Sequence, residues 1–165
     1  MTALIHAAHE HHARILPGVA QILETAELVG SVPCEELQPR VLAARGFVTT
    51  VLMPHMEAAE RALYPSLARI LSDPQAMAPM EREHAEIRHL CAELGRICDR
   101  HASPDAPFTP GDGLALRRVL FRLHAILRVH LDEEEHYLNV LRGNLTEAET
   151  AELARDLQHA TSVPL

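Results

Sequence analysis

Residues 127–138 read Leu127-Arg-Val-His130-Leu-Asp-Glu-Glu134-Glu-His-Tyr-Leu138. Leucine, histidine, glutamate and leucine recur here at spacings of three and four residues, which is the periodicity of one face of an α-helix. An imidazole and a carboxylate therefore point in the same direction as the apolar side chains. This stretch predicts an amphipathic helix that carries polar groups into a protein core.

Three other stretches repeat this arrangement. Residues 52–63 read Leu-Met-Pro-His55-Met-Glu-Ala-Ala-Glu60-Arg-Ala-Leu, with leucine and histidine at the same offsets. His12 and His84 each begin a His-Ala-x-Ile sequence within a further apolar stripe. On a helical wheel, each stretch places its histidine among apolar side chains. We therefore expect five polar side chains to converge in a dry interior: His12, His55, His84, His130 and Glu134.

Turn-forming residues divide the chain into four long helical stretches. Breaks are expected at residues 30–33 (Gly-Ser-Val-Pro), 72–74 (Ser-Asp-Pro) and 101–113. The helices are expected over residues 2–29, 39–71, 75–100 and 114–141. No alternating strand pattern is present. The predicted fold class is all-α, and four such helices with short connections favour an up-down-up-down four-helix bundle.

A short C-terminal helix is expected after Gly143, because Thr146 and Glu149 have the spacing of a capping box. The chain of 165 residues is long enough for one domain with a sizeable core and too short to argue for two. We expect residues 1–145 to form the bundle. Residues 146–165 are expected to form the short helix and a tail packed on the same domain.

The composition excludes several classes of protein. Apolar residues make up 47% of the chain and aromatic residues only 3%, which suits a helical core better than a sandwich or barrel. The formal net charge of −8 argues against a nucleic-acid partner. No run of about 18 apolar residues is present to cross a membrane. Three cysteines without CxxC spacing, and no signal peptide, lead us to expect a cytoplasmic protein.

Histidine accounts for 12 residues of the chain, and imidazole is the commonest metal ligand. A metal ion would neutralise the buried Glu134 and bind the histidine lone pairs, which are otherwise costly to bury. His130 and Glu134 lie one helical turn apart, close enough to bind one ion or to bridge two. Nitrogen and oxygen donors favour iron or manganese, with zinc as an alternative. A metal-free polar core is the competing interpretation.

Four stretches carry a family resemblance through their order and spacing: residues 10–17, 52–65, 80–87 and 120–141. In these stretches the chain resembles the hemerythrin-like family, also called the HHE cation-binding domain, over about residues 4–141. The resemblance implies a non-haem di-iron site bridged by carboxylates. It also implies that one iron is open to dioxygen, nitric oxide or peroxide. The expected cofactor is therefore iron, as one or two ions per chain.

Two positions depart from the family's pattern. The family has a bridging glutamate four residues after the histidine of the second helix, where this chain has Ala59, and Glu60 comes one residue late. Glu60 reaches the site if Pro54 or a local bulge rotates the helix. We therefore include Glu60 with the four histidines and Glu134 as a metal ligand. The family's second histidine on the third helix is replaced by Arg88.

Several residues are weaker candidates. Glu81 and His124 are alternative replacements for the missing ligands, and His9 lies near the face of His12. Tyr64 is expected to pack rather than to take part in chemistry. The other histidines are expected in solvent: His6, His11, His89, His101, His136 and His159.

Three functions remain open at this stage. The first is a binding protein or sensor for a small diatomic ligand or peroxide, in which a signal would require a protein partner. The second is a catalase-like or peroxidase-like enzyme, with Glu60, Glu81 or His124 as proton carrier. The third is a helical bundle whose metal site holds one ion or none. Neither a nucleic acid nor a membrane is an expected partner.

Overall fold

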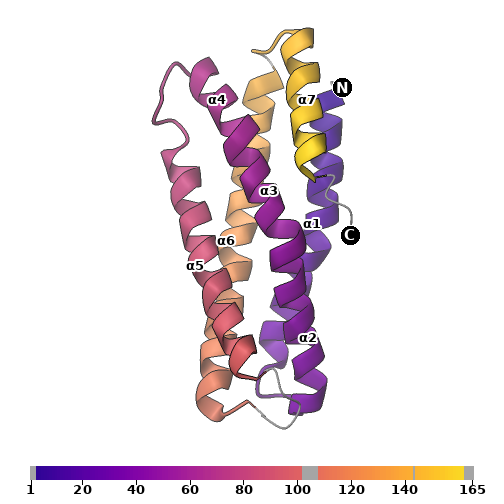
Figure 1. The fold of residues 1–165 in the computed structure, drawn as a ribbon, viewed down its shortest axis with the longest axis vertical. Helices are drawn as coiled ribbons and strands as arrows, with labels where there is room; N and C mark the ends of the chain where they lie inside the picture. The colour runs from indigo at the N-terminus through magenta and orange to yellow at the C-terminus, as the bar shows by residue number, and fades with distance from the viewer. Residues whose placement is uncertain (1–2, 102–107, 143, 162–165) are drawn as a thin grey trace.

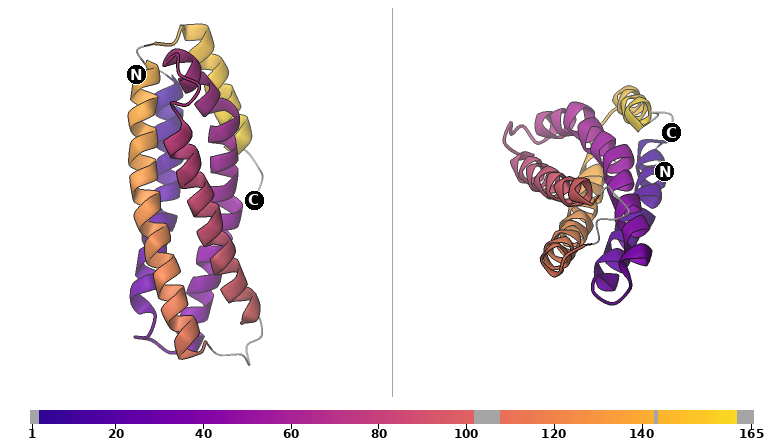
Figure 2. Two further views of the ribbon diagram at one scale, coloured as in Figure 1. Left: turned by 90° about the vertical axis from the view of Figure 1, so that its left-hand side faces the viewer. Right: turned by 60° about the horizontal axis from the view of Figure 1, so that its bottom comes forward.

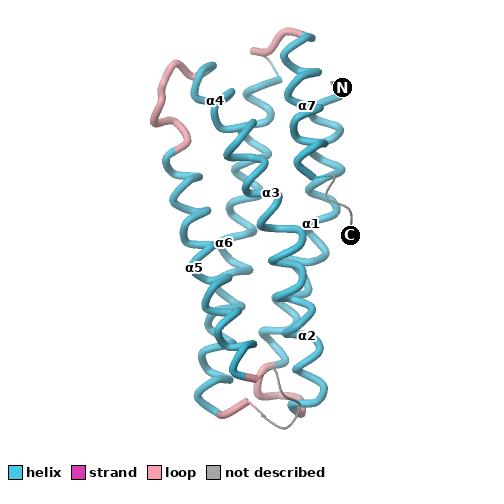
Figure 3. The backbone as a smooth tube through the Cα atoms, in the orientation of Figure 1, coloured by secondary structure: helices cyan, strands magenta, loops and turns pink. Residues whose placement is uncertain are grey.

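The structure is a computed structural model that describes residues 3–101, 108–142 and 144–161. Within these residues every regular element is a helix, so the all-α prediction is confirmed (Figures 1 and 3). The α-helices are α1 (Ala3–Leu28), α2 (Cys34–Phe47), α3 (Met53–Ala58), α4 (Tyr64–Ile70), α5 (Ala78–Arg100), α6 (Pro110–Arg142) and α7 (Glu147–Thr161). Two π-helical segments join α2 to α3 and α3 to α4: η1 (Val48–Leu52) and η2 (Ala59–Leu63).

The helices lie side by side along one long axis (Figure 1). The stretch from α2 to α4 is continuous, and together with α1, α5 and α6 it encloses a common core. α7 lies outside this group and packs on α1, α3 and η2 (Figure 2). The molecule is therefore a helical bundle with one additional helix on its surface. No helix in the described part of the chain is long and apolar enough to cross a membrane.

Two helices begin earlier than the sequence pattern predicts. α2 begins at Cys34 rather than at residue 39, because two glutamates occupy its first turn, where carboxylates stabilise the free N–H groups. α6 begins at Pro110 rather than at residue 114. The backbone N–H of Thr109 donates to the Asp112 carboxylate at 3.1 Å, and that of Asp112 donates to the Thr109 hydroxyl at 3.2 Å. This reciprocal cap begins the helix within the break expected at residues 101–113.

The C-terminal helix begins where its capping box predicts. The N–H of Glu149 donates to the Thr146 hydroxyl at 3.3 Å, and the N–H of Thr146 donates to the Glu149 carboxylate at 3.0 Å. Leu153 and Ala154 are buried in an apolar cluster that includes Leu63 of η2. α7 therefore covers the outer side of the second helical stretch.

Each π-helical segment ends two residues before a proline. Met53 precedes Pro54 and Tyr64 precedes Pro65, and each donates its N–H to the carbonyl five residues back instead of four. A proline has no N–H for the carbonyl four residues before it. A wider π-helical turn accommodates this gap without ending the helix. Each of these two prolines is therefore preceded by a π-helical turn, and the helix continues through both.

The interior consists of two apolar clusters with a polar layer between them. On α5, His84 lies between Met80 of one cluster and Ile87 of the other. The same order occurs on α6, where Glu134 follows Leu131 and precedes an apolar residue of the second cluster. All five polar residues expected in the interior are buried: His12, His55, His84, His130 and Glu134.

Candidate metal centre

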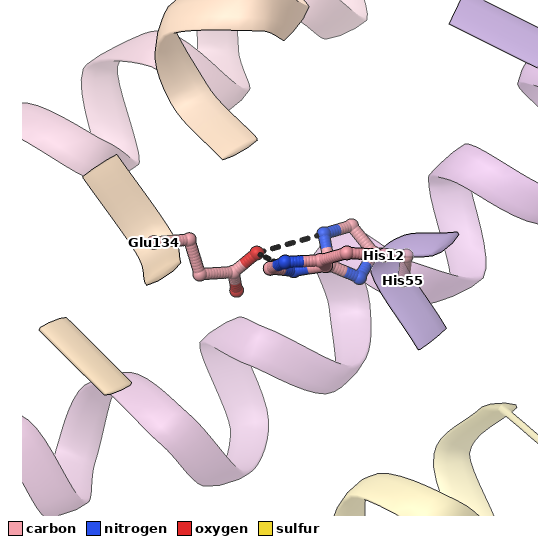
Figure 4. Close-up of side chains that lie close together, drawn as sticks. All are labelled: His12, His55 and Glu134. Atoms are coloured by element: carbon pink, nitrogen blue, oxygen red, sulfur yellow. Dashed lines mark hydrogen bonds and ion pairs between the residues drawn. The ribbon is translucent and has the colours of Figure 1, made fainter. Parts of the chain in front are cut away.

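Three buried side chains from three helices meet in the polar layer (Figure 4). His12 of α1, His55 of α3 and Glu134 of α6 each offer one nitrogen or oxygen, and these atoms lie within 4.8 Å of one another. His12 Nε2 donates to Glu134 Oε2 at 3.1 Å, and His55 Nε2 lies 3.0 Å from the same oxygen. We call these three residues the triad. In the described part of the chain, it is the one group of His, Cys, Asp or Glu side chains with this spacing.

The chemistry of the triad fits a cation. Burial opposes ionisation of Glu134, but the neighbouring His55 and His12 outweigh it and hold the pKa of this carboxyl well below its usual range. A negative charge therefore lies in the interior, with 2% of the residue exposed. His55 Nε2 is fully buried and, despite its distance of 3.0 Å from Glu134, lacks the orientation of a hydrogen bond. A metal ion would provide the carboxylate with a counter-charge and this nitrogen with a partner.

A second group of buried side chains lies in the same layer. His84 Nε2 and His130 Nε2 are 3.0 Å apart, and the Tyr64 hydroxyl donates to His84 Nε2 at 3.0 Å. Burial lowers the pKa of both His84 and His130 to about 4, so both rings are neutral at pH 7. Burial raises the pKa of Tyr64, so its hydroxyl remains a donor. Since metal–nitrogen bonds are about 2.0–2.1 Å long, both ring nitrogens fall within reach of one ion.

The outer nitrogens of these two histidines contact carboxylates. His84 Nδ1 donates to Glu60 Oε1 at 2.8 Å, and His130 Nδ1 donates to Glu83 Oε2 at 2.9 Å. Arg88 donates to the other oxygen of Glu60 at 2.7 Å. Burial raises the pKa of Glu60, but the hydrogen bonds from Arg88 and His84 together lower it by more. The pKa of Glu60 therefore lies below its usual value. Glu60, the sixth expected ligand, thus lies on the outer side of His84 and not within the triad.

Two histidines expected in solvent are instead partly or fully buried. His11 Nε2 lies 2.9 Å from His55 Nδ1, and burial, with smaller contributions from His55 and His12, lowers the pKa of His11 to about 3. His101 is 8% exposed, and its Nε2 lies 3.1 Å from Asp112 Oδ2 at the start of α6. The prediction of solvent exposure was therefore wrong for both residues. His11 sits at the edge of the apolar stripe of α1, which is the signal that was missed.

The alternative ligands lie away from the centre. Glu81 is exposed. His124 is half-buried on the part of α6 whose Leu123 and Leu127 pack in the larger apolar cluster. His89 and His136 are exposed, as expected. The side chains of the three remaining histidines lie outside the described residues: His6, His9 and His159.

Tyr64 and Glu83 are the residues whose contacts the sequence pattern missed. Tyr64 was expected only to pack, yet its hydroxyl bonds His84. Glu83 adjoins His84 in sequence, so a helical wheel points it about 100° away from that ring. Its contact is with His130 on another helix. Only the register between α5 and α6 identifies this partner.

One of the three comparisons with known proteins finds a match, and the match is to a family model. A family model described as hemerythrin HHE cation binding domain matches residues 3–141. The match spans α1 to all but the last residue of α6 and leaves α7 outside it. Searches of curated proteins and of solved structures find no significant match.

Proposed function

The chain belongs to the hemerythrin HHE cation-binding family, and we propose that it is an up-down-up-down four-helix bundle that holds non-haem iron and binds or senses dioxygen, nitric oxide or peroxide. The observation that carries this proposal is the triad, in which an ionised carboxylate and two imidazoles from three helices converge in the interior. A family match and a buried histidine–glutamate group together support a metal-binding protein.

The donor set favours iron among the candidate metals. Two histidines and one carboxylate with open positions are the ligands of many non-haem Fe(II) sites. No cysteine belongs to the group, which makes a structural zinc site of the usual thiolate type less suitable. The triad offers three ligand atoms, so iron bound there would have further coordination positions for a small exchangeable ligand.

The surrounding residues would control access and hydrogen bonding. Apolar side chains of the two clusters lie above and below the layer and exclude bulk water. The Tyr64 hydroxyl is the neutral donor at the inner side of His84. His11 contacts the outer nitrogen of His55 and so holds that ring in place.

Metal content tests the proposal directly. We would load the protein anaerobically with Fe(II), desalt it and measure iron and zinc per chain by elemental analysis. At least one iron per chain and a higher melting temperature than the metal-free protein are expected, because an ion that binds only the folded state stabilises it. Glu134→Ala should lose this iron, whereas Asp132→Ala, on the exposed side of the same helix, should keep it. No iron and an unchanged melting temperature would overturn the proposal.

Catalase-like activity is the second candidate, and one observation favours it. Glu60, whose side chain is 33% exposed, bonds His84, so one carboxylate connects solvent with the buried layer and could carry protons. Steady-state oxygen evolution from peroxide that disappears in His84→Ala would support the enzyme. Reversible absorbance changes on adding the ligand, without turnover, would support the binding protein.

A further inference from the structure

The C-terminal helix α7 lies against the part of the bundle that carries the triad. The residues matched by the family model end before this helix. α7 packs on α1, α3 and η2 along the outside of the bundle (Figure 2). His12 belongs to α1 and His55 to α3. α7 therefore lies across two of the three helices that supply the triad.

The seam between α1 and α3 leads from the surface to the triad. His11 of α1 is half-buried, and its Nε2 lies 2.9 Å from Nδ1 of the buried His55 across this seam. His55 Nε2 in turn lies 3.0 Å from Glu134 Oε2. A continuous row of polar side chains thus connects a partly exposed residue with the triad. α7 packs on both of the helices that form the seam.

Few buried side chains attach α7 to the bundle. Of the α7 side chains that the structure describes, Leu153 and Ala154 are buried, and they join the smaller apolar cluster with Leu63 and Tyr64. On α5, by contrast, buried residues recur along the whole helix, from Met80 to Cys98. A single helix of 15 residues is only marginally stable in water, so α7 depends on its packing.

The other contacts at the start of α7 are exposed to solvent. Thr146 and Glu149 form the cap, and Arg69 of α4 pairs with Glu149 at 3.0 Å. The side chains of this ion pair are 59% and 36% exposed, and ion pairs in solvent add little stability. Segments with few buried contacts open locally while the rest of a protein stays folded. These are the properties of α7.

We propose that α7 is a movable cover over the seam between α1 and α3, and that its opening admits small molecules to the triad. In the closed arrangement, which the structure shows, Leu153 and Ala154 seal the outer side of the second helical stretch. In the open arrangement α7 leaves this surface and the other helices stay in place. The inference rests on the proposed function for the molecules that are admitted, whereas the cover itself is a property of the metal-free chain.

The test measures how fast a small reagent reaches His55 in the metal-free protein. Diethyl pyrocarbonate acylates accessible imidazole nitrogens, and mass spectrometry of peptides gives the initial rate at each histidine. In Leu153→Ala the rate at His55 should rise at least about tenfold, because losing a buried leucine side chain favours the open arrangement by more than that factor. The rate at His101 should not change. His101 is buried beside the C-terminal end of α5, which lies away from α7 (Figure 1).

A milder variant and a matched control complete the experiment. Thr146→Ala removes the cap of α7 and leaves the apolar cluster intact, so the rate at His55 should rise about fivefold. Arg155→Ala is the control, because Arg155 is exposed on the same helix, and it should keep the wild-type rate. Circular dichroism shows whether each variant folds. Thr146→Ala alone decides the question if Leu153→Ala does not fold.

An increase at His55 alone, in Leu153→Ala and Thr146→Ala but not in Arg155→Ala, would support the cover. Equal increases at His55 and His101 would show that α7 opens only together with the whole bundle, and would overturn the inference. A rate at His55 that neither variant changes would also overturn it. The iron content of the loaded protein tests the proposed function separately, so the two failures are distinguishable.

Discussion

The four central histidines share one feature at the level of the single residue: each presents Nε2 to the interior. Three of them have a partner for Nδ1, which is His11 for His55, Glu60 for His84 and Glu83 for His130. The outer partner selects the tautomer and the ring orientation, and the inner nitrogen becomes the donor. A helical wheel indicates that a histidine faces inward, but the choice of nitrogen depends on a residue from another helix.

Tyr64→Phe should destabilise the metal-free protein by about 1–3 kcal/mol, because His84 Nε2 then loses its donor in a buried position. The measurement is urea denaturation at pH 7. Tyr137→Phe is the control, since Tyr137 lines an outer pocket with Val129 and Asp132. Loss of the Tyr137 hydroxyl should change the free energy of unfolding little. Equal effects of the two substitutions would contradict a specific role of the Tyr64 hydroxyl.

Among the elements, the second helical stretch departs most from regular geometry. Its first π-helical segment, η1, precedes Met53-Pro54, and the second, η2, precedes Tyr64-Pro65. Glu60 of η2 contacts His84. Proline alone does not account for this, since Pro17 in α1 and Pro39 in α2 lie in helices without a π-helical turn. η2 also packs on α7, through Leu63 and Leu153. Packing and the missing N–H together determine where the helix widens.

Pro65→Ala should narrow η2 toward an α-helical turn, because the restored N–H can bond the carbonyl four residues back. Glu60 would then turn away from His84, and the affinity of the protein for Co(II) should fall. Cobalt titration checks this. Pro39→Ala restores an N–H in α2, away from the centre, and should leave the affinity for Co(II) unchanged. An unchanged affinity for Co(II) in Pro65→Ala would show that packing alone maintains the π-helical turn.

The whole molecule places several ionisable groups in its interior, and its stability should therefore depend on pH. The pKa of His84 and of His130 is about 4 in the folded protein, against 6.5 for an ordinary histidine. Between these values the unfolded chain binds more protons than the folded chain, so folding becomes less favourable as the pH falls. Glu134, with its pKa below the usual range, acts in the same direction at lower pH.

We expect the melting temperature of the metal-free protein to fall as the pH is lowered from about 6.5 toward about 4. The underlying free energy of unfolding should fall by at most about 1.4 kcal/mol per histidine and pH unit. Scanning calorimetry at constant ionic strength measures this. His130→Gln should flatten the dependence, and His136→Gln, on the exposed face of α6, should not. A constant melting temperature between pH 7 and 5 would contradict neutral, buried imidazoles.

The sequence by itself determined the helical class, the approximate positions of the breaks between the long helices and the burial of five polar residues. These features depend on a periodicity of three to four residues along one chain. The sequence also determined the family, through the order of four stretches. The tertiary structure alone decided the contacts: the triad, the pairing of Glu60 with His84 and of Glu83 with His130, and the burial of His11 and His101. Each of these depends on the register between helices and on a π-helical turn, and a single helical wheel contains neither.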